Sequence, residues 1–298
     1  MVGEALIDEV IDGGRVGRYP GGSPSNVALG LARLEVDTVL HTMIGDDANG
    51  RLIRRHLGAA GVALTADSVT DAPTSRAVAT ISEDGSANYR FDVTWHPAPI
   101  ADLGTPTIIH AGSLGAFLEP GSRVTRDIVQ RGRSRDARIT FDPNIRPSLL
   151  PHLVETRTLF EELAFTSDVT KLSDEDADYL YPGLPPADVL DLLIDSGVRV
   201  AAITRGAEGA ILAGGGERVV IPPVAVRVVD TVGAGDSFMA ALIWALAFEG
   251  DEWTGEPVSA ERLRVVGRAA ASAAAITVSR PGADLPTLRE LRASLSGA

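Results

Sequence analysis

Apolar residues recur along the chain with two periods, which predict strands that alternate with helices. Short apolar runs predict buried strands in the second half of the chain: TIIHAG (107–112), ARITFDPN (137–144), RVAAITRG (199–206) and ERVVIPP (217–223). Apolar residues at three- and four-residue spacing predict helices around them, at 122–132, 149–163, 174–180, 187–196, 236–248 and 260–278. This alternation predicts an α/β fold, a three-layer sandwich with a mostly parallel central sheet between helices.

The first hundred residues follow the same rhythm less regularly. ALID (5–8) predicts a strand, SNVALGLARLEV (25–36) a helix, and TVLHTMIG (38–45) a second strand that ends at a glycine. DDANGRLIRRHLGAAGV (46–62) predicts a second helix. Ligands of parallel sheets bind at the carboxyl ends of the strands, so we expect the functional residues to follow the strands directly.

A hairpin interrupts this rhythm. SRAVATIS (75–82) and NYRFDV (88–93) are predicted strands, and EDGSA between them predicts a tight turn. Together with residues of about 10–20, the segment of about 74–95 predicts a small separate sheet, a lid beside the site. The alternative is an ordinary surface hairpin. We predict one domain over residues 1–298.

Composition and charge exclude several classes of protein. The net charge of −13 argues against a general nucleic-acid or anionic membrane surface, and the absence of cysteine excludes disulfides and thiolate metal sites. The longest apolar run, residues 238–248, is far shorter than the roughly 20 residues of a membrane span. The N-terminus has no basic segment followed by an apolar one. We therefore expect a cytoplasmic protein with no nucleic-acid or membrane partner.

The chain contains a single lysine, Lys171, among 27 lysines and arginines. Since a Walker A loop needs a lysine directly after a glycine, this kind of phosphate cradle is excluded. The chain also lacks a G-x-S-x-G elbow, an H-x-x-x-H pair and a G-x-G-x-x-G turn after the first strand. Any phosphate chemistry must use a different cradle.

One candidate cradle is DTVGAGDSF (230–238), directly before a long apolar helix. The first N–H groups of a helix are unpaired and carry positive partial charge, and small residues let an anion approach them. Gly233, Ala234 and Gly235 are therefore a candidate anion hole, and Asp236 beside them is a candidate general base for phosphoryl transfer. The alternative is a tight turn with Asp236 as the N-cap of the helix.

A second candidate is PGGSPSNVALG (20–30). Gly21 and Gly22 at a strand-to-helix junction would let a small polar ligand reach the backbone. The alternative is a turn followed by a helix with Ser25 or Asn26 as its N-cap.

These two stretches resemble the two signatures of the ribokinase / phosphofructokinase-B (PfkB) family of carbohydrate kinases. They stand in the family's order, with GDDANG (45–50) and TRGAEGAIL (204–212) between them, which are similar to its G-D-D-x-x-G turn and T-x-G-x-x-G nucleotide stretch. The resemblance covers residues 1 to about 288. It implies a ribokinase-like fold with a β-lid and ATP-dependent phosphorylation of a sugar hydroxyl with magnesium (Mg2+).

The family's roles pass to the matching positions of this chain. By this resemblance Asp236 is the catalytic base, next to the anion hole of residues 233–235. Asp8 and the loop residues Gly21, Gly22 and Asn26 bind the sugar, and the ATP-side loop consists of Thr204, Gly206 and Gly209.

Within the family the chain is most similar to bacterial fructokinases, through GEALID, FDPNIRP, KLSDEDADYL and TVSRPGADLP. Arg146 is then a cation near the phosphates or the sugar, and the alternative is an ion pair with Asp142. Lys171 falls on the nucleotide side. Ser173 and Asp176 stand where the family has the Asn and Glu of N-x-x-E, so Asp176 is expected to reach Mg2+ through water, or else to belong to an acidic first turn capped by Ser173.

The expected activity is that of a fructokinase, which converts fructose to fructose 6-phosphate. Two alternatives remain: a kinase for another small sugar or sugar acid, such as ribose or 2-keto-3-deoxygluconate, and a non-catalytic nucleotide- or sugar-binding regulator of the same fold. Relatives also suggest a monovalent cation such as potassium (K+) at Asp230 and a homodimer through the lid.

Overall fold

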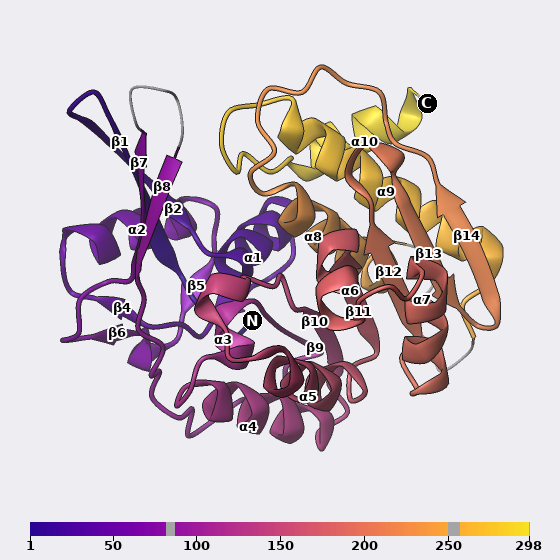
Figure 1. Cartoon of the computed structure of the whole chain (residues 1–298), viewed down its shortest axis with the longest axis horizontal. Coiled ribbons are helices and arrows are strands. Elements are labelled where there is room, and N and C mark those ends of the chain that lie inside the picture. Colours follow the sequence, from indigo (N-terminus) through magenta and orange to yellow (C-terminus); the bar gives the residue numbers. More distant parts are fainter. Residues whose placement is uncertain (82–86, 250–256, 298) are drawn as a thin grey trace.

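The computed structural model describes residues 1–81, 87–249 and 257–297, and a parallel sheet lies at its centre (Figure 1). Six strands follow the order β14-β13-β12-β11-β10-β9. Four of them are parallel: β9 (Ile108–Gly112), β10 (Arg138–Asp142), β11 (Val169–Ser173) and β12 (Val200–Thr204). At one edge β13 (Ala210–Gly214) and β14 (Glu217–Ile221) run antiparallel. The predicted α/β fold with a mostly parallel sheet is confirmed.

Short extended segments continue this sheet past β9. Val2 bridges Ala111 of β9 on one side and His41 on the other. The strand expected over 38–45 is divided into β3 (Val39–Leu40) and β4 (Ile44–Gly45), which pair with β5 (Ala63–Leu64) and β6 (Val69–Thr70). Between β3 and β4 the N–H of Thr42 donates to the hydroxyl of Ser68 at 3.1 Å instead of to a strand, which explains the interruption.

Helices cover both faces of the sheet. They are α1 (Ser23–Arg33), α2 (Ala48–Ala59), α3 (Leu114–Phe117), α4 (Ser122–Arg133), α5 (Leu153–Ala164), α6 (Asp174–Leu180), α7 (Pro186–Asp195), α8 (Ala234–Ala247), α9 (Ala260–Val278) and α10 (Leu288–Ser296). In the described residues no helix is long and apolar enough to cross a membrane.

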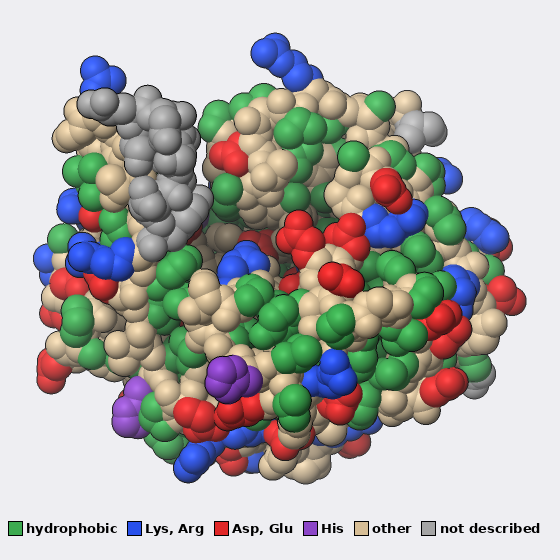
Figure 2. Space-filling view, viewed as in Figure 1, with side chains coloured by type: hydrophobic (Ala, Val, Ile, Leu, Met, Phe, Trp, Pro, Cys, Tyr) green, Lys and Arg blue, Asp and Glu red, His purple; other side chains and the backbone are tan. Residues whose placement is uncertain are grey.

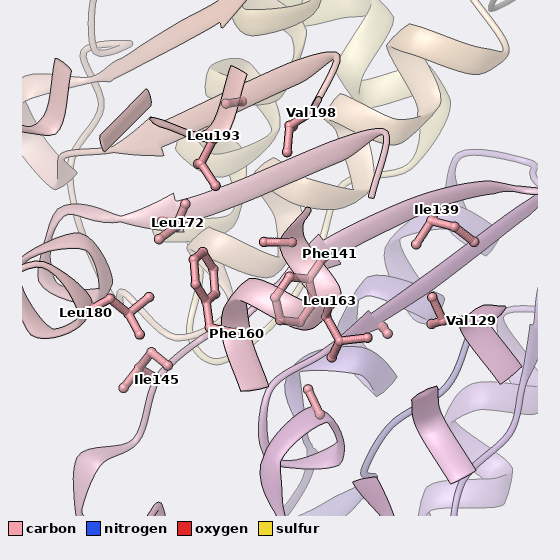
Figure 3. Packing of buried hydrophobic residues seen from close by; sticks show 14 of the residues in the cluster. Val129, Ile139, Phe141, Ile145, Phe160, Leu163, Leu172, Leu180, Leu193 and Val198 are labelled. Carbon is pink, nitrogen blue, oxygen red and sulfur yellow. The ribbon is translucent and has the colours of Figure 1, made fainter. Parts of the chain in front are cut away.

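The alternation of side chains along the strands produces two cores. In β12, Ala201 and Ile203 belong to the core under α4–α7, while Val200 and Ala202 belong to the core under α8 and α9. Figure 3 shows the first core, in which the ring centroids of Phe141 and Phe160 are 5.8 Å apart. Because both faces are buried, most side chains of the parallel strands are apolar, and the exceptions include Asp142 of β10 and Lys171 of β11.

A four-stranded sheet stands apart from the central one, at the upper left of Figure 1. Its order is β2-β1-β7-β8, with β1 (Leu6–Asp12), β2 (Arg15–Gly21), β7 (Arg76–Ile81) and β8 (Ala87–Asp92). The pair β1–β7 is parallel and the other two pairs are antiparallel. The predicted turn between β7 and β8 lies largely outside the described residues.

Candidate active site

Asp236 lies in the first turn of α8, where α8 meets the N-terminus of α1. Gly233, in the left-handed region with a φ of 78°, precedes the helix, so Asp236 is its third residue. The side-chain oxygen Oδ1 of Asp236 accepts a hydrogen bond from the hydroxyl of Ser23 at 2.6 Å, and Oδ2 accepts one from the amide of Asn26 at 2.8 Å. Two donors on a neighbouring helix therefore fix the direction of this buried carboxylate.

The capping alternatives drawn from the sequence are wrong at both helices. Gly22, with a φ of 97°, occupies the N-cap of α1 without a side-chain bond, so neither Ser25 nor Asn26 caps it. Gly233 occupies the N-cap of α8, so Asp236 does not. The side chains that could have capped α1 are buried, and that of Asn26 is turned toward Asp236 instead.

The beginning of α8 is open to an anion on the side of Gly235. A Cβ placed on this glycine would lie 3.0 Å from Nζ of Lys171, so the ammonium group lies directly beside the backbone. Gly233 is needed for another reason, because a Cβ there would lie 2.7 Å from that of Ala283. The N–H of Ala234 donates to the carbonyl of Thr231 at 3.3 Å, but the positive end of the α8 dipole and the nearby ammonium group both attract negative charge. This corner can therefore hold a phosphoryl group.

Asp8 extends from β1 toward the same corner. A Cβ placed on Gly21 would lie 2.1 Å from Oδ2 of Asp8, so the carboxylate fills the space that the missing side chain leaves. Burial raises the pKa of Asp8 to about 6, the charge of Asp236 adds to this, and Arg146 opposes it. These three charged groups are therefore near one another.

Glu4 is a buried carboxylate that the sequence analysis overlooked, and the charge of Asp236 acts on it. Glu4 accepts a hydrogen bond from the N–H of Gly115 at 2.9 Å. Burial raises its pKa to about 7, against hydrogen bonds from the hydroxyl of Ser113 and from backbone N–H groups, while the charge of Asp236 adds to the rise. Glu4 joins the start of β1 to the turn after β9.

Asp142 and Lys171 form a second buried pair behind the start of α8. Nζ of Lys171 lies 2.9 Å from Oδ2 of Asp142. Burial acts to lower the pKa of Lys171, but the charges of Asp142, Asp176 and Asp236 hold it above its ordinary value. Burial also raises the pKa of Asp142 to about 6, although Lys171 opposes this rise. The only lysine of the chain is thus a cation at the candidate phosphoryl site.

The Asp142–Lys171 pair contradicts the alternative in which Arg146 forms an ion pair with Asp142. Among the described residues Asp142 pairs with Lys171, and the guanidinium of Arg146 donates to the carbonyl of Ile145 at 3.0 Å. The side chain of Arg146 is exposed, and its positive charge acts to lower the pKa of Asp8. Arg146 is therefore a cation near Asp8, and its predicted contact with the phosphates or the sugar stays a prediction.

Asp176 is held by backbone groups. Oδ1 accepts a hydrogen bond from the N–H of Ile145 at 2.7 Å, and Oδ2 accepts one from the N–H of Ser173 at 2.9 Å. The hydroxyl of Ser173 accepts one from the N–H of Asp176 in return, which completes a capping box at the start of α6. The predicted cap is present, and the carboxylate ties α6 to the segment that carries Arg146.

The loop that is predicted to bind the nucleotide follows β12, which is the neighbour of β11, the strand of Lys171. Thr204 ends β12, and its hydroxyl donates to the carbonyl of Leu172 at 3.3 Å. Gly206 and Gly209 have φ of 50° and 84°, and a Cβ on Gly209 would lie 2.1 Å from the carbonyl oxygen of Ile221. Glycine is therefore required for the turn, which brings backbone groups to the carboxyl end of the sheet.

Asp230 anchors the segment that precedes α8. Its two side-chain oxygens accept hydrogen bonds from the N–H groups of Val232 at 3.0 Å and Gly282 at 2.8 Å. These bonds hold the pKa of Asp230 below its ordinary value. The segment of 230–233 is thereby joined to the turn after α9.

The structure brings most of the predicted site residues together at the carboxyl edge of the central sheet. Figure 2 shows a hollow on this side of the molecule, between the small sheet and the main body, with acidic and basic side chains at its mouth. Sequence reasoning missed Ser23 and Glu4, although both lie inside quoted motifs, GGSPSN and GEALID. It treated Asp142 only as a partner of Arg146, because contacts between neighbouring strands leave no local pattern.

Known proteins share this architecture over the whole chain. The model of the family described as pfkB family carbohydrate kinase matches residues 2–290. A fructokinase from Rhizobium leguminosarum bv. trifolii is 32% identical over 263 residues, which are 83% of this chain and 79% of the relative. The crystal structure of a fructokinase with bound ATP from Xylella fastidiosa is 26% identical with a TM-score of 0.84, covering 99% of this chain and 97% of the other. An aminoimidazole riboside kinase from Salmonella enterica is 25% identical with a TM-score of 0.83, covering 100% and 98%.

Proposed function

This chain belongs to the pfkB family of carbohydrate kinases, and on that premise we propose that it is a fructokinase, which transfers the γ-phosphoryl group of ATP to the 6-hydroxyl of fructose. The fructokinases among its relatives support fructose as the sugar. The observation that carries the mechanism is the carboxylate of Asp236, held by Ser23 and Asn26 beside the N-terminus of α8.

Asp236 acts as the general base. Because both of its oxygens are held by donors from α1, the carboxylate keeps one direction when the sugar binds. It takes the proton of the attacking hydroxyl as the new bond to phosphorus forms. Asp8 accepts hydrogen bonds from other sugar hydroxyls and selects the one that faces Asp236, while Gly21, Gly22 and Arg146 shape the sugar pocket.

The start of α8 stabilises the charge of the phosphoryl group in transfer. The backbone of residues 233–235 at the positive end of the α8 dipole supplies a fixed positive potential, although the N–H of Ala234 also donates to the carbonyl of Thr231. Lys171 adds a full charge beside Gly235. The loop of Thr204, Gly206 and Gly209, which follows the neighbouring strand β12, binds the nucleotide. Electrostatic stabilisation by backbone and one lysine thus replaces the P-loop.

Mg2+ fits this site as a companion of the nucleotide. No group of three or more His, Asp or Glu side chains within residues 1–81, 87–249 and 257–297 could hold a metal alone. Mg2+ usually keeps several waters and binds substrate phosphates, where it neutralises charge. Asp176, whose oxygens already accept two backbone N–H bonds, would contact one of these waters.

The test is a coupled assay of ADP release with fructose, ribose, 2-keto-3-deoxygluconate and aminoimidazole riboside, with and without K+. Fructose should give the highest kcat/KM, and Asp236→Asn should lower kcat by roughly 10² to 10⁴-fold while the thermal unfolding temperature stays close to that of the wild type. A better second sugar would replace fructose as the substrate. Nucleotide binding without ADP release for every sugar would favour a regulator instead.

Three further features stay predictions. The four-stranded sheet acts as a lid and pairs with that of a second copy, which light scattering would detect as a dimer. A K+ ion binds near Asp230 through backbone carbonyls, since the carboxylate itself holds two N–H groups, and activity that is indifferent to K+ would contradict this. The predicted location is the cytoplasm.

A further inference from the structure

The ion pair of Lys171 and Asp142 is more deeply buried than its chemistry would favour. The two side chains are 5% and 1% exposed, and they come from the adjacent strands β11 and β10. Removing two charges from water costs several kcal/mol per ion, and only further hydrogen bonds to the remaining donors and acceptors offset this cost.

Within the described part of the chain these further bonds are absent. Oδ1 of Asp142 is buried and has no hydrogen-bond partner there. An ammonium group has three donors, and the bond to Asp142 is the one hydrogen bond from Lys171 found there. A pair that served stability alone would leave neither a free donor nor a free acceptor, so this pair is built to receive other groups.

The place of the ammonium group points to an anion. Lys171 lies beside Gly235 at the positive end of the α8 dipole, where a cation is repelled. Asp142 accepts a hydrogen bond from the ammonium group of Lys171 and holds this group in place against the repulsion. When an anion enters, the ammonium and the backbone N–H groups gain a common partner.

We propose that Asp142 is a positioning residue, which holds the ammonium group of Lys171 over the N-terminus of α8 so that both contact the same phosphoryl group of ATP. The inference rests on the proposed function. Asp142 does not contact the reacting atoms, so any effect of Asp142 on catalysis depends entirely on Lys171.

A double-mutant cycle tests this dependence. Lys171→Met should lower kcat/KM for ATP by roughly 10² to 10³-fold, and Asp142→Asn by at least about tenfold, with KM for the sugar nearly unchanged in both. The double variant should lie within about twofold of Lys171→Met alone, because Asp142 has nothing left to position. Losses that multiply in the double variant would overturn the proposal.

Asp168→Asn is the matched control. Asp168 is also a buried carboxylate, 4% exposed, which accepts a hydrogen bond from Arg133, but it precedes β11 at the opposite edge of the same sheet. Its substitution should lower the thermal unfolding temperature and leave kcat/KM for ATP unchanged. An equal loss of kcat/KM in Asp168→Asn would mean that Asp142 acts through general stability, which overturns the proposal.

A spectroscopic readout separates this inference from the proposed function. Because Lys171 is the only lysine, protein labelled with ¹³C-lysine gives one Cε signal. A non-hydrolysable ATP analogue should shift this signal in the wild type, and the shift should be largely lost in Asp142→Asn at a nucleotide concentration that saturates both proteins. The measurement needs no sugar, so it stays valid if fructose is the wrong substrate. An unmoved signal in the saturated wild type, or the same shift in both proteins, would refute the role of Asp142.

Discussion

Gly21→Ala changes the sugar side of the site by a single methyl group. Gly21 ends β2 and has no positive φ, so alanine fits the backbone. The new Cβ would lie 2.1 Å from Oδ2 of Asp8, whereas real Cβ atoms essentially never come closer than 3.0 Å to a heavy atom. The carboxylate must therefore move by about 0.9 Å, the difference between the two distances, which is enough to misdirect its hydrogen bonds.

The expected loss follows from this displacement. A misplacement of about 1 Å in a positioned group costs on the order of 10²-fold in rate, or about 2.7 kcal/mol of transition-state stabilisation. We therefore expect kcat/KM for the sugar to fall about 10²-fold, while KM for ATP stays within about twofold because Lys171 and the start of α8 are unchanged. The assay is coupled ADP release with each substrate varied in turn.

Gly58→Ala provides the matched control for this substitution. Gly58 lies within α2, and no atom lies within 4 Å of a Cβ placed there. Alanine should leave both KM values unchanged and stabilise the protein by about 0.5–1 kcal/mol. If Gly21→Ala keeps kcat/KM for the sugar within about threefold of the wild type, Asp8 does not select the sugar hydroxyls from its present position, and the reasoning is refuted.

Three other predictions use the charges of the site and the base of the small sheet. Because burial raises the pKa of Asp8 to about 6, kcat/KM for the sugar should fall about tenfold per pH unit below pH 6; a flat profile down to pH 5 would contradict its role. Glu4 has a pKa of about 7 in the folded state and 4.5 as its ordinary value, so folding binds a proton and the free energy of unfolding should fall by up to about 3 kcal/mol as the pH rises through this range. Glu4→Gln should flatten that fall in urea titrations at pH 5 and 7.5, and an unchanged slope would show that another group causes it. Asp47→Ala removes the N-cap bond to Gly50 and two bonds to Thr74, and should cost about 2 kcal/mol in urea unfolding; a loss below about 0.5 kcal/mol would mean that these bonds are not stabilising.

Local patterns predicted the regular elements well. The boundaries of α6 and α9 agree with the periodic segments 174–180 and 260–278, since each begins at a serine cap that a short-range pattern reveals. The start of α1 was predicted wrongly because Ser25 and Asn26 are good caps by composition. In the structure a glycine makes the turn, and the amide of Asn26 reaches a residue 210 positions away.

The sequence by itself determined the α/β alternation and the order of the motifs, and it selected Asp236 as the candidate base, because each depends on residues within one short segment. It also showed that no P-loop lysine is present. The tertiary structure alone decided that Asp142 meets Lys171, that Asp8 fills the space over Gly21, and that Glu4 is buried against Gly115. These contacts join strands and helices that are distant in the chain, and the packing of the sheet, not any local propensity, sets their distances and the pKa values that follow from burial.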